Sequence, residues 1–106
     1  MEGITFERLC RTPHSEAYSI NRGEERAGRV DLHYGSTTVY GTLVVELEFS
    51  EDEVSELIEL VDEQLVLTAD VERDDFQVAV FQGKELGFFS DDYYDDDDEE
   101  GEEEEG

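Results

Sequence analysis

Residues 50–65 read SEDEVSELIELVDEQL, and this stretch predicts an amphipathic helix. Ser50 suits an N-cap, and Glu53 follows three residues later, which is the spacing of a capping box. Acidic residues fill the first turn, where they interact favourably with the helix dipole. The apolar residues recur at helical spacing and form one stripe: Val54, Leu57, Ile58, Val61 and Leu65. A single stripe needs a single packing partner, most simply the face of a β-sheet.

The sequence before the helix predicts a β-hairpin. Residues 29–34 and 37–49 read RVDLHY and TTVYGTLVVELEF, and Gly35-Ser36 separates them. A two-residue loop would place Leu32 opposite Val39 and Val30 opposite Gly41. One face of this hairpin is apolar: Val30, Leu32, Tyr34, Val39, Leu43, Val45, Leu47 and Phe49. The opposite face is polar, as expected for an antiparallel sheet that is covered on one side only.

Weaker strand patterns extend the sheet on both sides of the hairpin. Upstream, residues 4–9 and 17–22 read ITFERL and AYSINR, with a loop around Pro13 between them. Downstream, residues 76–81 and 85–89 read FQVAVF and ELGFF, and they predict a second hairpin that places Val80 opposite Leu86. The predicted fold class is therefore α+β, a mostly antiparallel sheet in the order β-β-β-β-α-β-β with one amphipathic helix on one face.

The charge of the chain is concentrated at its C-terminal end. The net charge is −25 over 106 residues, and the last sixteen residues hold twelve carboxylates and no cation. Such a run has nothing to bury and repels itself, so we expect a disordered acidic tail over 91–106 behind a compact domain over 1–90. The domain alone carries −13. Negative charge of this size repels nucleic acid and anionic membranes, so we expect a basic protein surface as the partner.

Motifs for catalysis or metal binding are missing from the sequence. The single cysteine, Cys10, lies near Arg8 and Arg11, but we expect it to be a partly buried small residue on a strand that points Arg11 to the opposite face. His14 and His33 do not give the ligand spacing of a zinc site. We expect no cofactor and no metal.

The compartment is inferred from two further features. The N-terminus lacks the pattern of a signal peptide, and no apolar run approaches the ~20 residues of a membrane span. We therefore expect a cytoplasmic protein.

The polar face of the hairpin is the strongest candidate for a contact surface on the domain. Asp31 and His33 would share it with Tyr40, and an Asp-His pair can orient an imidazole for base chemistry. An ordinary solvated strand face, or a recognition patch with one aromatic side chain, is the interpretation we prefer. The candidate partner-contact residues on this face and in the tail are Arg29, Asp31, His33, Thr38, Tyr40, Thr42, Tyr93, Tyr94, Asp95, Asp96, Asp97 and Asp98.

Three classes of function are compatible with these features. The favoured class is a small acidic interaction or adaptor module, which is not an enzyme and binds a basic partner surface. The second is a regulator that mimics nucleic acid, because a carboxylate at nearly every tail position resembles the ~3.4 Å phosphate spacing of one DNA strand. The third is a small-ligand binder or enzyme that uses the polar face 29–42, which requires a concave pocket with convergent polar groups.

Overall fold

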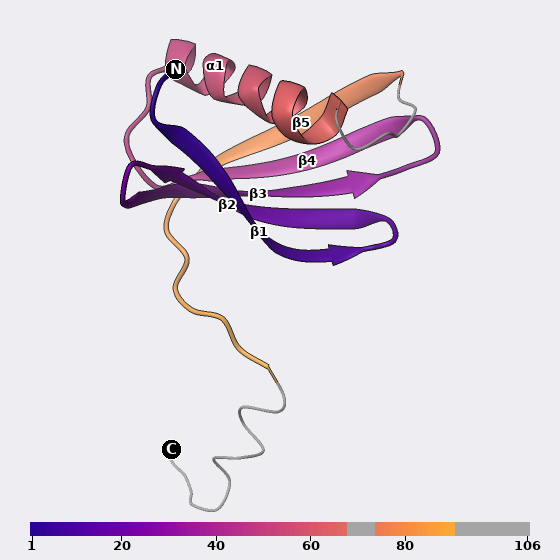
Figure 1. The fold of residues 1–106 in the computed structure, drawn as a ribbon, viewed down its shortest axis with the longest axis horizontal. Helices are drawn as coiled ribbons and strands as arrows, with labels where there is room; N and C mark the ends of the chain where they lie inside the picture. Colours follow the sequence, from indigo (N-terminus) through magenta and orange to yellow (C-terminus); the bar gives the residue numbers. More distant parts are fainter. Residues whose placement is uncertain (68–73, 91–106) are drawn as a thin grey trace, which may run out of the picture.

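The computed structural model describes residues 1–67 and 74–90. Within them, five strands form one sheet in the order β1-β2-β3-β4-β5, and one helix connects the last two strands (Figure 1). The elements are β1 (Ile4–Thr12), β2 (Ser15–Arg22), β3 (Glu25–Tyr34), β4 (Thr38–Val45), α1 (Glu51–Val61), η1 (Asp62–Val66) and β5 (Asp75–Gln82). The first four strands pair antiparallel, and β5 pairs parallel with β4.

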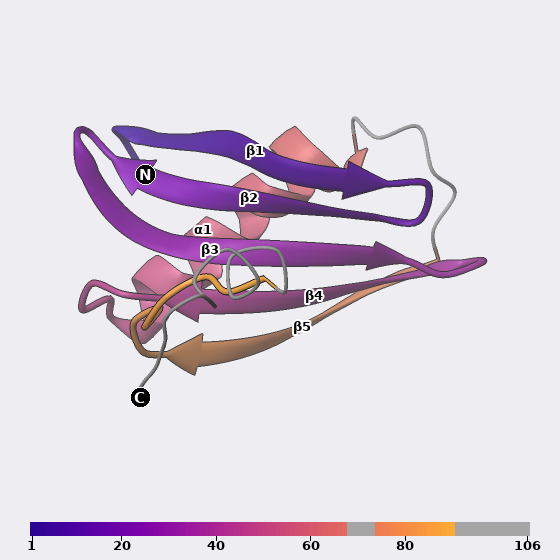
Figure 2. The same cartoon turned by 90° about the horizontal axis from the view of Figure 1, so that it is seen from below.

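The helix lies along one face of the sheet, which we call the helix face (Figure 1). The other side, the open face, carries no helix among the described elements, and Figure 2 views the sheet from this side with α1 behind it. The core lies between α1 and the helix face, and its fully buried larger members are Ile20, Val30, Leu32, Val39, Leu43, Leu57, Val61 and Val66. The predicted fold class, a mostly antiparallel sheet with one amphipathic helix packed on one face, is confirmed.

The predicted helix forms with its capping box. The Glu53 amide donates to Ser50 Oγ (3.2 Å), and the Ser50 amide donates to Glu53 Oε1 (2.8 Å). Leu57 and Val61 of the predicted stripe are buried against the sheet. After Val61 the chain continues as a π-helical turn, η1, which brings Val66 into the core beside Leu65 because a π turn repeats after five residues. The regular helical period predicted Leu65 but not Val66.

The β3–β4 hairpin has the predicted faces but a different register. Leu32 lies opposite Gly41 and Tyr34 opposite Val39, two residues away from the predicted pairing. The connection is correspondingly longer, and the Gly35 amide donates to the Thr38 carbonyl (2.8 Å). A shift of two residues leaves every side chain on its predicted face, because side chains alternate with a period of two. Gly41 suits its new position, since a Cβ there would lie 3.2 Å from the Phe76 ring.

The β1–β2 hairpin differs from the expectation at its turn and at a bulge. Thr12 pairs with Ser15, so the predicted loop around Pro13 is only a tight turn. The register shifts between Arg8 and Cys10, which is a β-bulge. The bulge puts Arg11 on the same face as Arg8, and Cys10 is exposed rather than partly buried. Both expectations for this strand were therefore wrong, because one extra residue inverts the alternation downstream of it.

The second predicted hairpin does not form. β5 ends at Gln82, the Gly83 amide donates to the Val45 carbonyl (3.0 Å), and residues 85–89 are not a strand. β5 instead returns through α1 to lie parallel to β4, as expected when a helix crosses a sheet between two neighbouring strands. Residues 83–90, which we call the post-β5 segment, project from the open face (Figures 1 and 2).

The predicted acidic tail, including Tyr93, Tyr94 and Asp95 to Asp98, lies outside the described residues. Neither helical element of residues 1–67 and 74–90 has the length and apolar character needed to cross a bilayer.

Candidate partner-contact site on the open face

The six predicted contact residues of the domain share the open face of β3 and β4. Across the two strands, Arg29 lies opposite Val44, Asp31 opposite Thr42 and His33 opposite Tyr40. His33 and Tyr40 are exposed, whereas the side chains nearer the other end of the face are half-buried. Thr38 lies on the same face at the start of β4. The face therefore has an exposed aromatic end, at His33 and Tyr40, and a charged end, at Arg29 and Asp31.

Asp31 binds an arginine and not the histidine. The Arg29 Nε–H donates to Asp31 Oδ1 at 2.8 Å, and this hydrogen bond raises the pKa of the Arg29 guanidinium against the opposing effect of burial. Among the described residues no hydrogen bond joins Asp31 to His33. The arrangement that would orient an imidazole for base chemistry is therefore not formed.

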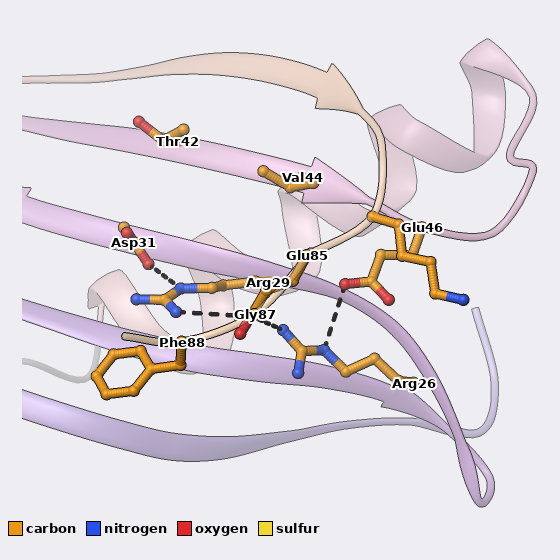
Figure 3. Close-up of a pocket in the computed structure, with 10 residues that line it drawn as sticks. Arg26, Arg29, Asp31, Thr42, Val44, Glu46, Glu85, Gly87 and Phe88 are labelled. Carbon is orange, nitrogen blue, oxygen red and sulfur yellow. Dashed lines mark hydrogen bonds and ion pairs between the residues drawn. The ribbon is translucent and has the colours of Figure 1, made fainter. Parts of the chain in front are cut away.

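The post-β5 segment is attached to the charged end of the open face through Glu85. Glu85 Oε1 lies 3.1 Å from Arg26 Nη2 and 4.0 Å from Arg29 Nη1 (Figure 3). Arg26 also faces Glu46, with 3.6 Å between Nε and Oε2. One carboxylate thus bridges two arginines from β3, and it links the end of the described chain to the middle of the sheet.

Two hollows flank the post-β5 segment. The first, shown in Figure 3, has a volume of about 330 Å³ and lies over β3 and β4. Its lining residues are Arg26, Arg29, Asp31, Thr42, Val44, Glu46, Lys84, Glu85, Gly87 and Phe88. The second, of about 320 Å³, adds Leu9 and Cys10 of β1, and Glu85 and Phe88 line both hollows.

The charges in these hollows largely satisfy one another. Arg29 is paired with Asp31, and Arg26 with Glu46 and Glu85. Glu85 already lies between the two arginines, so an anion that bridged them there would compete with its carboxylate. The hollows therefore favour a small ligand less than their volume alone would suggest, since binding would first have to break existing ion pairs.

The post-β5 segment exposes apolar side chains that the sequence pattern placed in a strand. Leu86 is 97% exposed and Phe88 82% exposed, although both lie within a few residues of the Glu85 ion pair. Phe89 is also exposed, and the acidic run begins directly after Ser90. The position of these residues next to the acidic run is the signal that could have identified them as exposed. Asp and Glu are almost never fully buried, so a strand that leads directly into an acidic run is unusual in a core.

A second charged cluster lies on the helix face, and the sequence did not indicate it. Glu16 is buried and its Oε1 accepts hydrogen bonds from the hydroxyls of Tyr18 (2.7 Å) and Tyr34 (3.2 Å). Its Oε2 lies 3.5 Å from Arg11 Nε and 3.9 Å from Arg8 Nη1. The bulge in β1 makes this cluster, because it turns both arginines to the same face. Every group in the cluster has a partner, and its hydrogen bonds and ion pairs join β2 to β1 and to β3.

No group of three or more His, Cys, Asp or Glu side chains suited to a metal ion occurs in residues 1–67 and 74–90. Comparisons with protein-family models, with curated proteins and with solved structures find no match.

Proposed function

We propose that this protein is an acidic interaction module that binds a basic partner protein through two neighbouring parts of its C-terminal region. The post-β5 segment supplies apolar anchors, and the acidic residues 91–106 supply charge. The observation that carries the proposal is the exposure of Leu86 and Phe88 beside an ion pair that attaches their segment to the sheet.

The anchors supply the binding energy in this proposal. Burying a Leu or Phe side chain that is otherwise in water contributes roughly 1.5–3 kcal/mol each. Aromatic and apolar side chains that enter a partner pocket are the usual centres of protein interfaces. We therefore assign Leu86 and Phe88 to an apolar pocket on the partner.

The Glu85 ion pairs place the anchors rather than drive the binding. Exposed pairs of this kind are worth only about 0–1 kcal/mol. Even a weak attachment reduces the conformational freedom that the segment would otherwise lose when it binds. Arg26 and Arg29 thus affect binding indirectly, because they hold the post-β5 segment in position.

The acidic run sets the charge of the partner. Twelve carboxylates follow the anchors in sequence, so a basic rim around the apolar pocket would be attracted over a distance that depends on salt. A groove that normally binds nucleic acid is one such surface. Competition between this protein and a DNA or RNA oligonucleotide for the captured partner distinguishes that case from other basic surfaces.

The test is capture of partners on the immobilised protein at several salt concentrations. Leu86→Ser/Phe88→Ser should abolish capture at every salt concentration, because the anchors are lost. Deletion of 91–106 should weaken capture at low salt and reduce its salt dependence, because the domain that remains carries −13. Leu67→Ser is the matched control, because Leu67 is also exposed but lies at the end of η1.

The proposal is wrong if the Leu86→Ser/Phe88→Ser protein captures the same partners with the same affinity as the wild type. Circular dichroism of each variant shows whether the fold is intact, which we expect since the substituted side chains are exposed.

A further inference from the structure

The two edges of the sheet are protected very differently. β1 is interrupted by a bulge between Arg8 and Cys10, and it carries charged side chains along its length. Bulges and charges are the devices by which natural sheets prevent an edge strand from pairing with another chain. β5, the opposite edge, shows a continuous pairing with β4 over eight residues and carries Asp75 as its single charged residue.

The β5 edge is also apolar on both sides. Val80 is 40% exposed on the helix face, and Phe81 is 56% exposed on the open face. The Gly83 amide donates to β4. Because amide directions alternate along a strand, those of Val78 and Val80 point away from β4, to an edge that no described residue covers.

We propose that the β5 edge pairs with β5 of a second copy of this chain, antiparallel and related by a two-fold axis normal to the sheet. This dimer joins two sheets into one continuous sheet with both helices on the same side. The site is separate from the post-β5 anchors, so the dimer does not depend on the proposed partner.

Symmetry and charge together select one register. A two-fold axis normal to the sheet passes midway between one residue and the same residue of the second copy. Every other pair across the axis then has both side chains on the same face of the sheet. With Ala79 on the axis, Val78 lies opposite Val80 of the second copy, and Asp74, just before β5, comes near Lys84, two residues after its end. Lys84 is the single lysine of the chain and has no ion pair within the described residues.

The charges explain why a second copy fits this edge antiparallel. Asp74 and Asp75 stand at one end of β5 and Lys84 at the other. Antiparallel pairing brings unlike charges together at both ends, whereas parallel pairing would bring like charges together. The outward amides and carbonyls of Val78 and Val80 then bond to one another across the axis.

Cysteine cross-linking tests both the dimer and its register. In a Cys10→Ser background, Ala79→Cys puts a thiol on the two-fold axis, where the Cα atoms of a non-hydrogen-bonded pair are about 4.5 Å apart. This separation is within the range of about 4.4–6.8 Å that a disulfide spans. We expect Ala79→Cys to give a covalent dimer under mild oxidation.

Gln77→Cys and Phe81→Cys are the matched controls, because each faces the other position across the axis. Each thiol lies roughly four residues, or about 13 Å, from its own copy, so neither variant should cross-link alone. Mixed together, the two variants should form a heterodisulfide. Equal cross-linking of all three single variants would mean random collision and would overturn the proposal.

A charge exchange tests the same register without a disulfide. Asp74→Lys should weaken dimerisation in sedimentation equilibrium by roughly two- to thirtyfold, because two exposed pairs become repulsive. Asp74→Lys/Lys84→Asp should restore it. Glu59→Lys on the exposed side of α1 makes the same change in net charge and should not weaken the dimer.

A wild-type chain that stays monomeric up to about 1 mM overturns the proposal. So does an Asp74→Lys protein that dimerises as well as the Glu59→Lys protein.

Discussion

Glu16 illustrates at the scale of one residue how a buried carboxylate is accommodated. Its two oxygens face two tyrosine hydroxyls and two arginines, so the desolvated charge has partners on both sides. The same arrangement acts on the tyrosines. Burial and the nearby Glu16 carboxylate raise the pKa of Tyr34 well above its ordinary value, and burial and the hydrogen bond to Glu16 raise that of Tyr18.

These shifts predict a loss of stability at alkaline pH. A raised phenol pKa means that the folded protein holds its proton more tightly than the unfolded chain does. The contribution is fully present below the unfolded pKa of about 10 and is lost as pH rises above it. Tyr34→Phe should therefore flatten the fall in the free energy of unfolding above about pH 10, measured by urea denaturation.

Tyr40→Phe is the control for this pH dependence, because Tyr40 lies on the opposite face from Glu16. It should keep the wild-type slope. A Tyr34→Phe protein with an unchanged slope would show that other groups cause the alkaline loss.

At the scale of elements, local signals predicted the helix and the strands best. The 50–65 stretch carries its cap, its dipole-compatible acids and its apolar stripe within the segment itself, and α1 forms as expected. The 85–89 stretch has an apolar pattern but no local constraint that holds it as a strand. Glu85 instead contacts Arg26, which is distant in sequence, and this stretch lies over the open face.

The capping box predicts a measurable contribution to stability. Ser50→Ala removes the acceptor for the Glu53 amide and should lower the free energy of unfolding by about 1 kcal/mol in urea denaturation. Ser55→Ala, at an exposed position inside α1, should leave stability unchanged or raise it slightly, because alanine has the higher helix propensity. Equal losses in the two variants would contradict a specific role for the cap.

At the scale of the whole molecule, negative charge is the dominant property. A net charge of −25 destabilises the compact state through self-repulsion. The seven cations lie mostly on the first three strands, and their ion pairs join β1 to β2 and β3 to the post-β5 segment. These ion pairs thus offset the repulsion locally. The repulsion among the remaining carboxylates is sensitive to salt.

Salt should therefore stabilise the fold. Raising KCl from about 0.15 M to about 1 M shortens the Debye length from about 8 Å to about 3 Å and screens this repulsion. We expect the thermal midpoint to rise, and to rise less after deletion of 91–106, which changes the net charge from −25 to −13. The same salt dependence in both proteins would place the repulsion within the domain alone.

The sequence predicted which residues lie on the open face, but not which of their side chains pair with one another. Arg29, Asp31 and Thr42 lie on one face because side chains of a strand alternate, and this holds for any register that differs by two. The partner of Asp31 was not predictable, because Arg29, His33 and other neighbours on that face compete for it. The role of Glu85 depends on a contact across 59 positions of the chain, which no local pattern encodes.

The amino-acid sequence by itself determined the helix, its cap, the two faces of the hairpin and the acidic character of the molecule. Each of these follows from the spacing or charge of residues that are close in the chain. Only the tertiary structure decided the β3–β4 register, the bulge that turns Arg11 toward Glu16, the parallel placement of β5 and the course of the post-β5 segment. These features depend on which distant segments meet, and that is settled by packing and pairing over the whole sheet.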